Sequence, residues 1–490
     1  MLFGSTILLY VVALLGVAIW KSRATKTHDD FVVAGRAVPV PLLVGTLVCT
    51  WIGSGSLFGG AGLAYRTGIA ELWFSFGAWV GLLAVYFLAG RVRRIAQYTV
   101  PDLLEQRYNA AARVLGTLAI ILAYVTIAAY QFRGGGWILS IVTDGRISPV
   151  AGMYLTAATI VAFTAFAGMV SIVTVDIFNG VLITLGVLVA LPYTVWQLGG
   201  IGAVAARLPP AHLQPLGGHN ALWAAGVALP TFLLLLGESG MYQKFFSAKD
   251  EKAARRAVIG MIVGVVTIET TLALVAIVGR AAYPDLLERT SVVGRAASET
   301  IVLYTARHGL PAALGALLLA AAVAIVLSTG NTFLLVPSTN LSRDLFQRFV
   351  RPDASERSKL LVQRAGIVAF GLLGLLLLTQ FETVLAMALY AYSLVGASLT
   401  PALLAAFLWK RVTAQGGVAC IAGGLLTIVG LLVLDRAGVS FVLSIAGNRF
   451  DFASSDYIVI PGVIASVGLL VVVSLLTKPS PPEKWKPFMG

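Results

Sequence analysis

The chain has 490 residues, of which 58% are hydrophobic and only 12% are charged. Soluble domains are about 45–50% apolar and about 25% charged, so this composition excludes a compact soluble enzyme and a disordered chain. Apolar stretches of about twenty residues, the length that crosses a bilayer, recur along the whole sequence. The composition therefore predicts an all-α polytopic membrane protein.

The formal net charge of +13 does not require a nucleic-acid partner. Basic residues in short cytoplasmic loops set the orientation of membrane proteins, and they account for the excess more simply. The two cysteines, Cys49 and Cys420, lie in apolar segments and indicate no disulfide framework. The four histidines are scattered without metal-ligand spacing. We expect neither nucleic-acid binding nor a transition-metal site.

Apolar runs predict thirteen transmembrane spans. The first has no basic region before it and no small-residue cleavage site, which favours a transmembrane helix over a signal peptide. With the N-terminus outside, 25 of the 35 Lys and Arg residues fall in inside loops and nine in outside loops. This bias predicts an outside N-terminus and an inside C-terminus. The spans cover residues 2–20, 41–64, 70–90, 114–142, 149–169, 173–197, 220–240, 256–279, 310–338, 363–380, 383–409, 415–435 and 457–477.

Glycine interrupts two of these spans, one in each half of the chain. The second contains Trp-Ile-Gly-Ser-Gly-Ser over residues 51–56, and the seventh contains Gly-Glu-Ser-Gly over residues 237–240. An unwound segment is tolerated in a membrane only where its backbone lines a cavity or binds an ion. Paired interruptions are typical of inverted-repeat transporters, although glycines also let helices pack closely. The pair favours transport.

Adjacent hydroxyls occur in the ninth span, at Ser328 and Thr329. Such hydroxyls often bond to a carbonyl of the preceding helical turn. Alternatively, they supply oxygens to a hard monovalent cation whose coordination is completed by carbonyls of the broken second span. The residues by themselves leave both interpretations open.

Ionisable side chains within spans are functional candidates, because their burial is costly. Arg133 could hold a substrate carboxylate through a bidentate pair, or form a structural ion pair with Glu238 or Asp176. Asp176 could bind or guide a cation, or cap backbone amides. Glu238 could face the solute or neutralise Arg133. Glu269, in the eighth span, has no evident partner.

The sequence shows no phosphate-binding loop, no nucleophile elbow and no separate soluble domain. We therefore expect a protein that is not an enzyme and that draws energy from an ion gradient. No organelle-targeting segment is visible, which indicates a bacterial-type plasma membrane.

Four motifs occur in the order in which the sodium:solute symporter family carries them. They are Asp-Asp-Phe-Val-Val-Ala-Gly-Arg at 29–36, the stretch around Pro-Asp-Leu-Leu at 98–108, the stretch around Gln-Lys at 241–249, and Ser-Leu-Val-Gly-Ala-Ser-Leu-Thr-Pro at 393–401. Together they extend from residue 28 to about residue 411, and the chain resembles this family.

The resemblance implies the fold of the leucine transporter (LeuT), in which ten core helices form two inverted five-helix repeats. One helix would precede this core and two would follow it. On this chain the implied parts are residues 1–40 (first helix and cytoplasmic loop), 41–197 (first repeat), 198–219 (extracellular loop), 220–410 (second repeat) and 411–490 (two helices and a cytoplasmic tail).

The resemblance also implies a sodium site. Matched by motif, its ligands are the backbone carbonyls of Cys49, Ile52 and Ile325 and the hydroxyls of Ser328 and Thr329. The carbonyl positions accept any side chain, so the two hydroxyls are the informative match.

Asp176 falls where relatives have an aspartate linked to sodium movement or to a second sodium site. Some relatives use hydroxyls one turn further along the ninth span. Here Thr332 supplies one, but Asn331 replaces the serine, which argues against a second sodium ion.

For the solute, Trp51 occupies a position that is acidic in proline-type relatives, and sialic-acid-type relatives hold a carboxylate with an arginine on the same helix as Arg133. The resemblance thus implies sodium-coupled symport of a small polar solute, with a carboxylate or amino-acid-like solute favoured, by alternating access. The expected solute site comprises Trp51, Gly53, Ser54, Arg133 and Glu238.

The alternatives to sodium symport are proton coupling through Asp176 or Glu238, a transport-incompetent sensor, and a membrane-embedded enzyme. The expected partners are the solute, the sodium ion (Na⁺) and the lipid bilayer, with no obligatory protein partner.

Overall fold

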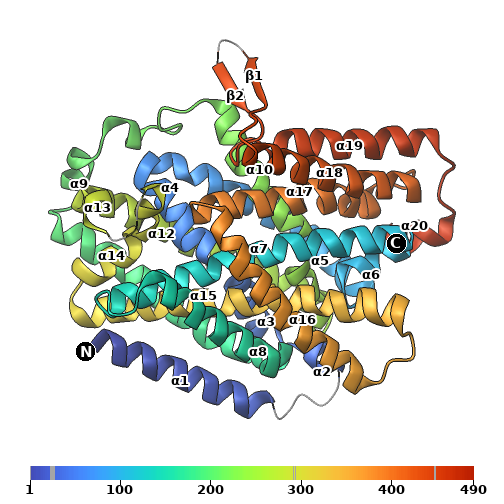
Figure 1. Cartoon of the computed structure of the whole chain (residues 1–490), viewed down its shortest axis with the longest axis horizontal. Helices are drawn as coiled ribbons and strands as arrows, with labels where there is room; N and C mark the ends of the chain where they lie inside the picture. The colour runs from blue at the N-terminus through green and yellow to red at the C-terminus, as the bar shows by residue number, and fades with distance from the viewer. Residues whose placement is uncertain are drawn as a thin grey trace.

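The computed structural model describes residues 2–22, 28–95, 97–290, 292, 294–445 and 448–489, and part of the first predicted loop (23–27) lies outside them. These residues form a bundle of long helices with one β-hairpin, as Figure 1 shows. Among them, eleven helices are long and apolar enough to cross a membrane, and two shorter apolar helices cover Phe3–Leu14 and Val40–Trp51. The prediction of an all-α polytopic membrane protein is confirmed.

The first part of the chain begins with one helix at the edge of the bundle and continues into the first broken helix. The side chain of Asn109 accepts a hydrogen bond from the amide of Ala112 and starts the long helix that follows it. The elements are α1 (Leu2–Ser22), α2 (His28–Val33), η1 (Ala34–Arg36), α3 (Val40–Trp51), η2 (Gly55–Gly60), α4 (Ala61–Thr67), η3 (Gly68–Glu71), α5 (Leu72–Ile95), α6 (Val100–Arg107), α7 (Ala110–Val142) and α8 (Pro149–Gln197).

Two predicted spans, 149–169 and 173–197, belong to the single element α8. It is interrupted at Gly168, whose φ of 62° lies in the left-handed region that glycine adopts without strain. A side chain there would also collide with the ring of Phe31, since an added Cβ would lie 2.7 Å from its Cδ2 atom. The glycine therefore marks the turn between the two membrane-crossing parts of α8.

The second part repeats this pattern, with a broken helix followed by long helices. Its elements are α9 (Ile201–Arg207), η4 (Pro210–Leu213), α10 (Ala221–Gly237), α11 (Ser239–Ser247), α12 (Glu251–Ala282), α13 (Leu286–Arg289), η5 (Gly294–Thr300), α14 (Ile301–His308), α15 (Ala312–Asn340), η6 (Leu341–Val350), α16 (Glu356–Leu377), η7 (Leu378–Gln380) and α17 (Val384–Leu408).

The last elements lie at the periphery. Figure 1 shows α1 along one edge of the bundle and α18 with α19 along the opposite edge, with the hairpin projecting beyond the helices. The two strands pair antiparallel, with Val442 opposite Asp451. The elements are α18 (Ala414–Arg436), β1 (Val442–Ile445), β2 (Asn448–Asp451), α19 (Val459–Leu476) and α20 (Pro482–Met489).

The two broken helices change direction through the same backbone conformation. Ile52, at the end of α3, has φ −72° and ψ 99°, and Glu238, between α10 and α11, has φ −70° and ψ 104°. Among the described spans, α15 and α17 are the most buried, and α15 packs against α7 and α8. The first break therefore lies beside buried helices rather than facing lipid.

Candidate sodium and solute site

An oxygen cluster forms where the break after α3 meets α15. The hydroxyl oxygen of Thr329 lies 3.1 Å from the carbonyl oxygen of Cys49 and 3.0 Å from that of Ile52. The hydroxyl oxygen of Ser328 lies 3.5 Å from the Cys49 carbonyl. Ile325 is buried one helical turn before Thr329. The structure thus brings together four of the five residues predicted to hold sodium and places the fifth beside them.

This cluster contains more hydrogen-bond acceptors than hydroxyl protons available to them. Ser328 donates its single hydroxyl proton to Asp176 at 2.5 Å, which leaves the Thr329 hydroxyl as the donor for the carbonyls of both Cys49 and Ile52. One hydroxyl proton cannot satisfy two carbonyls, and a buried acceptor without a partner is costly. Unwound carbonyls together with hydroxyls suit a hard monovalent cation, so the residues present fit sodium.

Asp176 lies directly behind the cluster. Its carboxylate accepts hydrogen bonds from the hydroxyls of Thr46, at 2.6 Å, and Ser328. The sulfhydryl of Cys49 donates to its backbone carbonyl at 3.2 Å. The carboxylate thus contacts side-chain hydroxyls rather than helix-capping amides, and it links α3, α8 and α15.

Beyond the break, Ser54 contacts Gln131 of α7, and Gly53 lies between α7 and Thr329 of α15. The amide and the hydroxyl of Ser54 donate to Oε1 of Gln131 at 3.0 and 2.6 Å. The Nε2 group of Gln131 is buried and has no hydrogen-bond partner among the described residues. A Cβ atom at Gly53 would lie 2.8 Å from Thr329 Cγ2 and 3.1 Å from this Nε2. Gln131, which sequence reasoning missed, therefore places an unused donor at the break.

A carboxylate also lies at this break. Glu269 on α12 is buried and accepts from the indole N–H groups of Trp51, at 2.8 Å, and Trp79, at 2.9 Å, and from the hydroxyl of Ser56 at 3.2 Å. The ring of Trp51 stacks on Tyr392 of α17 with centroids 6.4 Å apart. The acidic residue without an evident partner in the sequence therefore holds the predicted solute residue Trp51 in place.

Arg133 and Glu238, both predicted to face the solute, bond to the protein's own backbone. The guanidinium of Arg133 donates to the carbonyls of Leu378, Phe381 and Glu382. The carboxylate of Glu238 accepts from the amides of Gly240 and Met241 at the start of α11. It also accepts from the Tyr124 hydroxyl at 2.6 Å. The alternative of an ion pair from Arg133 to Glu238 or Asp176 is wrong for the described residues, because these closer partners occupy all three side chains.

Lys244 follows the seventh predicted span (220–240) and was counted among the 25 inside-loop Lys and Arg residues, but it lies in the interior on α11. Its side chain is 0% exposed, and its ammonium lies 3.0 Å from the Thr46 carbonyl and 3.9 Å from a carboxylate oxygen of Asp176. The signal available in the sequence was its place in the Gln-Lys motif directly after the second break.

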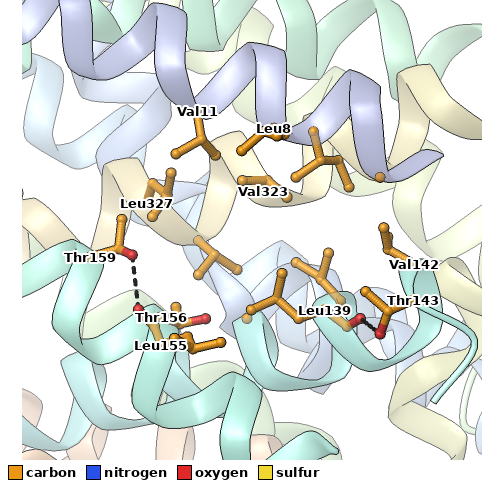
Figure 2. Close-up of a pocket in the computed structure, with 15 residues that line it drawn as sticks. Leu8, Val11, Leu139, Val142, Thr143, Leu155, Thr156, Thr159, Val323 and Leu327 are labelled. Atoms are coloured by element: carbon orange, nitrogen blue, oxygen red, sulfur yellow. Dashed lines mark hydrogen bonds between the residues drawn. The ribbon is translucent and has the colours of Figure 1, made fainter. Parts of the chain in front are cut away.

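An apolar pocket of about 280 Å³ lies elsewhere, between α1, α7, α8 and α15. In Figure 2 the side chains of Leu8, Val323 and Leu327 face it. The hydroxyls of Thr143 and Thr159 at its border donate to carbonyls of their own helices. Apart from three threonines the lining is glycine and aliphatic side chains, and it offers no charged group to a charged solute.

The comparison with known families settles what kind of protein carries this geometry. The model of the sodium:solute symporter family matches residues 31–424. The chain belongs to the sodium:solute symporter family. It is accordingly a multi-pass membrane transporter, a sodium-coupled symporter of small solutes rather than an enzyme, with Na⁺ as its coupling ion.

Curated relatives span almost the whole chain. The sodium/pantothenate symporter of Escherichia coli (strain K12) is 28% identical over 475 residues, covering 90% of this chain and 95% of that protein. The osmoregulated proline transporter OpuE of Bacillus subtilis (strain 168) is 24% identical over 490 residues, covering 96% and 94%. A sodium/proline symporter of Staphylococcus aureus is 24% identical over 503 residues, covering 96% and 92%.

Solved structures show the same fold. A Na⁺-coupled sialic acid symporter in a substrate-bound outward-open state superposes with a TM-score of 0.80 at 17% identity, covering 98% of this chain and 99% of that one. MhsT in complex with L-phenylalanine superposes with a TM-score of 0.58 at 14% identity, covering 90% and 98%. The predicted LeuT-like fold is confirmed at this level.

Proposed function

We propose that sodium binds between the carbonyls of Cys49, Ile52 and Ile325 and the hydroxyls of Ser328 and Thr329, and that this binding drives uptake of a small carboxylate or amino-acid-like solute. The observation that carries the proposal is the shortage of protons among the oxygens at the break. A cation there supplies the missing positive charge.

The same site explains coupling. In the proposed architecture, residues 41–197 and 220–410 are inverted repeats within thirteen transmembrane helices, with the N-terminus outside and the C-terminus inside. The cluster joins α3 of the first repeat to α15 of the second. Sodium then fixes the position of one repeat relative to the other, and each ligand raises the affinity for the other by the same factor.

The proposed solute site lies on the opposite side of the same break. Gly53 allows close approach of the backbone, Gln131 offers its free Nε2 donor, and Ser54 orients Gln131. Pantothenate and proline, named for two groups of relatives, are both carboxylates that such a donor can bind. Trp51, held by Glu269, forms the aromatic wall.

Arg133 and Glu238 take supporting roles in this proposal. Their hydrogen bonds to backbone groups hold the start of α17 and the second break in place. They shape the solute site without touching the solute.

The test is the melting temperature of purified protein in sodium, compared with potassium and choline at equal ionic strength. A ligand bound only by the folded state stabilises it by RT ln(1 + [L]/Kd), which is about 2.7 kcal/mol at one hundred times Kd. We expect a rise specific to sodium that Thr329→Ala abolishes. Ser466→Ala, at a buried serine in α19, is the matched control and keeps the rise.

Equal melting temperatures in sodium and choline would reject the proposed sodium site. With the sodium effect established, uptake of labelled proline and pantothenate into proteoliposomes, with and without a sodium gradient, tests the solute class. If sodium changes the binding of the solute but no solute is taken up, the protein is a sensor.

A further inference from the structure

A second set of oxygen atoms lies beside the proposed sodium site, and the ammonium of a lysine contacts them. The ammonium of Lys244 lies 3.0 Å from the Thr46 carbonyl oxygen, 3.4 Å from the Thr332 hydroxyl oxygen and 3.9 Å from an Asp176 carboxylate oxygen. We call these three oxygen atoms and the ammonium the Lys244 cluster. Carbonyl, hydroxyl and carboxylate oxygens are also the ligands that would coordinate a free monovalent cation.

The Lys244 cluster is sealed within the protein. The side chain of Lys244 is 0% exposed and that of Asp176 is 1% exposed. Four elements supply its members, namely α3 with Thr46, α8 with Asp176, α11 with Lys244 and α15 with Thr332. A buried carboxylate requires a paired positive charge, and the ammonium is the basic group that faces it.

The Lys244 cluster connects directly to the proposed sodium site. The Asp176 carboxylate accepts on one oxygen from Thr46, and on the other from the sodium-site residue Ser328. A second sodium ion at the Thr46 and Thr332 oxygens would lie within about 4 Å of the ammonium. At that separation, with an effective dielectric constant near 20, two unit charges repel enough to weaken binding about a thousandfold.

We propose that the Lys244 ammonium is a tethered cation that takes the place of a second sodium ion, so that each chain binds a single sodium. The proposal rests on the proposed function for the identity of the first ion. It assigns Lys244 the role of setting the number of coupled ions, because a tethered charge cannot be released with the solute. The Asp176 carboxylate pairs with the ammonium directly and contacts the first sodium site through the Ser328 hydroxyl.

The experiment counts bound ions with ²²Na⁺ in equilibrium binding to purified protein. We expect one sodium per chain in the wild type and in Lys244→Arg, which keeps the charge. Lys244→Met keeps the length of the side chain but leaves Asp176 without its counter-charge, and we expect it to bind two. Lys244→Met combined with Asp176→Asn removes both charges and is expected to return to one. Lys359→Met, at a lysine paired with the exposed Glu356, is the matched control and stays at one.

Two sodium ions per wild-type chain overturn the proposal, and so does a folded Lys244→Met variant that still binds one. Should Lys244→Met fail to fold, the wild-type count and the charge-neutral double variant still decide, because two ions in either of them overturn it. Failure of the proposed function looks different. A wild-type chain without bound sodium, or with one ion that survives Thr329→Ala, refutes the first site while the gain in Lys244→Met still tests the second.

Discussion

Arg133 shows how a buried charge acts through hydrogen bonds. The last carbonyls of a helix have no partner within it, and a guanidinium presents several donors in one plane. Arg133 on α7 donates to the carbonyls of Leu378, Phe381 and Glu382, in the segment that joins α16 to α17. It thereby fixes the start of α17, whose Tyr392 stacks on the ring of Trp51.

Replacing Arg133 tests this role against direct binding of the solute. Arg133→Ala leaves three carbonyls without their donor, and we expect a loss of folding free energy on the order of 2–3 kcal/mol, measured by denaturant unfolding. Arg133→Lys restores part of it, since an ammonium does not reproduce the planar fork. Arg364→Ala, which removes one exposed hydrogen bond to Ala165, is the control with an expected change below about 0.5 kcal/mol. A stable Arg133→Ala variant with a raised KM for carboxylate solutes would return Arg133 to the solute site.

The predicted sodium-site residues that the structure brings together come from two spans and were predicted from the resemblance to the family. Ser328 and Thr329 are adjacent, and their match to a family pattern carried the carbonyls of Cys49 and Ile52 with it. Glu269 could not be paired in advance, because its partner Trp51 is 218 positions away in the chain. Hydropathy treats each span separately and records no such contact between helices.

At the scale of elements, apolar periodicity predicts where helices lie better than where they end. Each of the thirteen predicted ranges overlaps helical segments, although two of them lie within the single element α8. However, the span predicted over 310–338 continues through α15 into η6 and reaches Val350. That extension is polar, so a hydropathy criterion stops before it. Contacts with charged residues hold it in place, and these contacts form only after folding.

An ionic network built around Arg113 holds η6 against α6 and α7. Arg113 contacts the carboxylates of Asp102 and Glu105 at 2.5 Å and that of Asp344 at 2.6 Å. Asp344 is fully buried. Removing one member of a buried ionic group leaves a charge without compensation, which costs far more than losing an exposed pair.

Arg113→Ala is accordingly expected to destabilise the fold by about 3–5 kcal/mol. Arg307→Ala, which breaks an exposed pair with Asp144 of similar length, should cost no more than about 1 kcal/mol. Denaturant unfolding of both variants in detergent gives the comparison. Equal effects of the two substitutions would show that the Arg113 network is no more important than a surface pair.

At the scale of the whole molecule, a hydrogen bond between α4 and η5 joins the two proposed repeats. Glu299, in η5, accepts from the amides of Val384 and Leu385 at the start of α17, in the second repeat. Its neighbour Ser298 accepts from Arg66 of α4, in the first repeat. Of these contacts, those of Glu299 lie within the proposed second repeat, and the contact between Arg66 and Ser298 joins the two proposed repeats.

Glu299 gives the stability of the folded protein a pH dependence that can be measured. Burial raises the pKa of its carboxyl to about 7, against the opposing effect of hydrogen bonds from Leu385 and Val384 and of the positive charges on Arg66 and Arg133. A carboxyl whose pKa is raised on folding holds its proton more tightly in the folded state, so its contribution to stability is complete below about pH 4.5 and is lost as pH rises towards 7.

We therefore expect the melting temperature of the wild type to fall between pH 5 and 8 by more than that of Glu299→Gln, which cannot ionise. Other buried carboxyls titrate in both proteins, so the difference between the two pH profiles isolates Glu299. Glu288→Gln, at an exposed glutamate of α13, is the matched control and should reproduce the wild-type profile. Parallel profiles for wild type and Glu299→Gln would show that Glu299 keeps its charge in the folded protein. The contacts of η5 with α17 would then be insensitive to pH in this range.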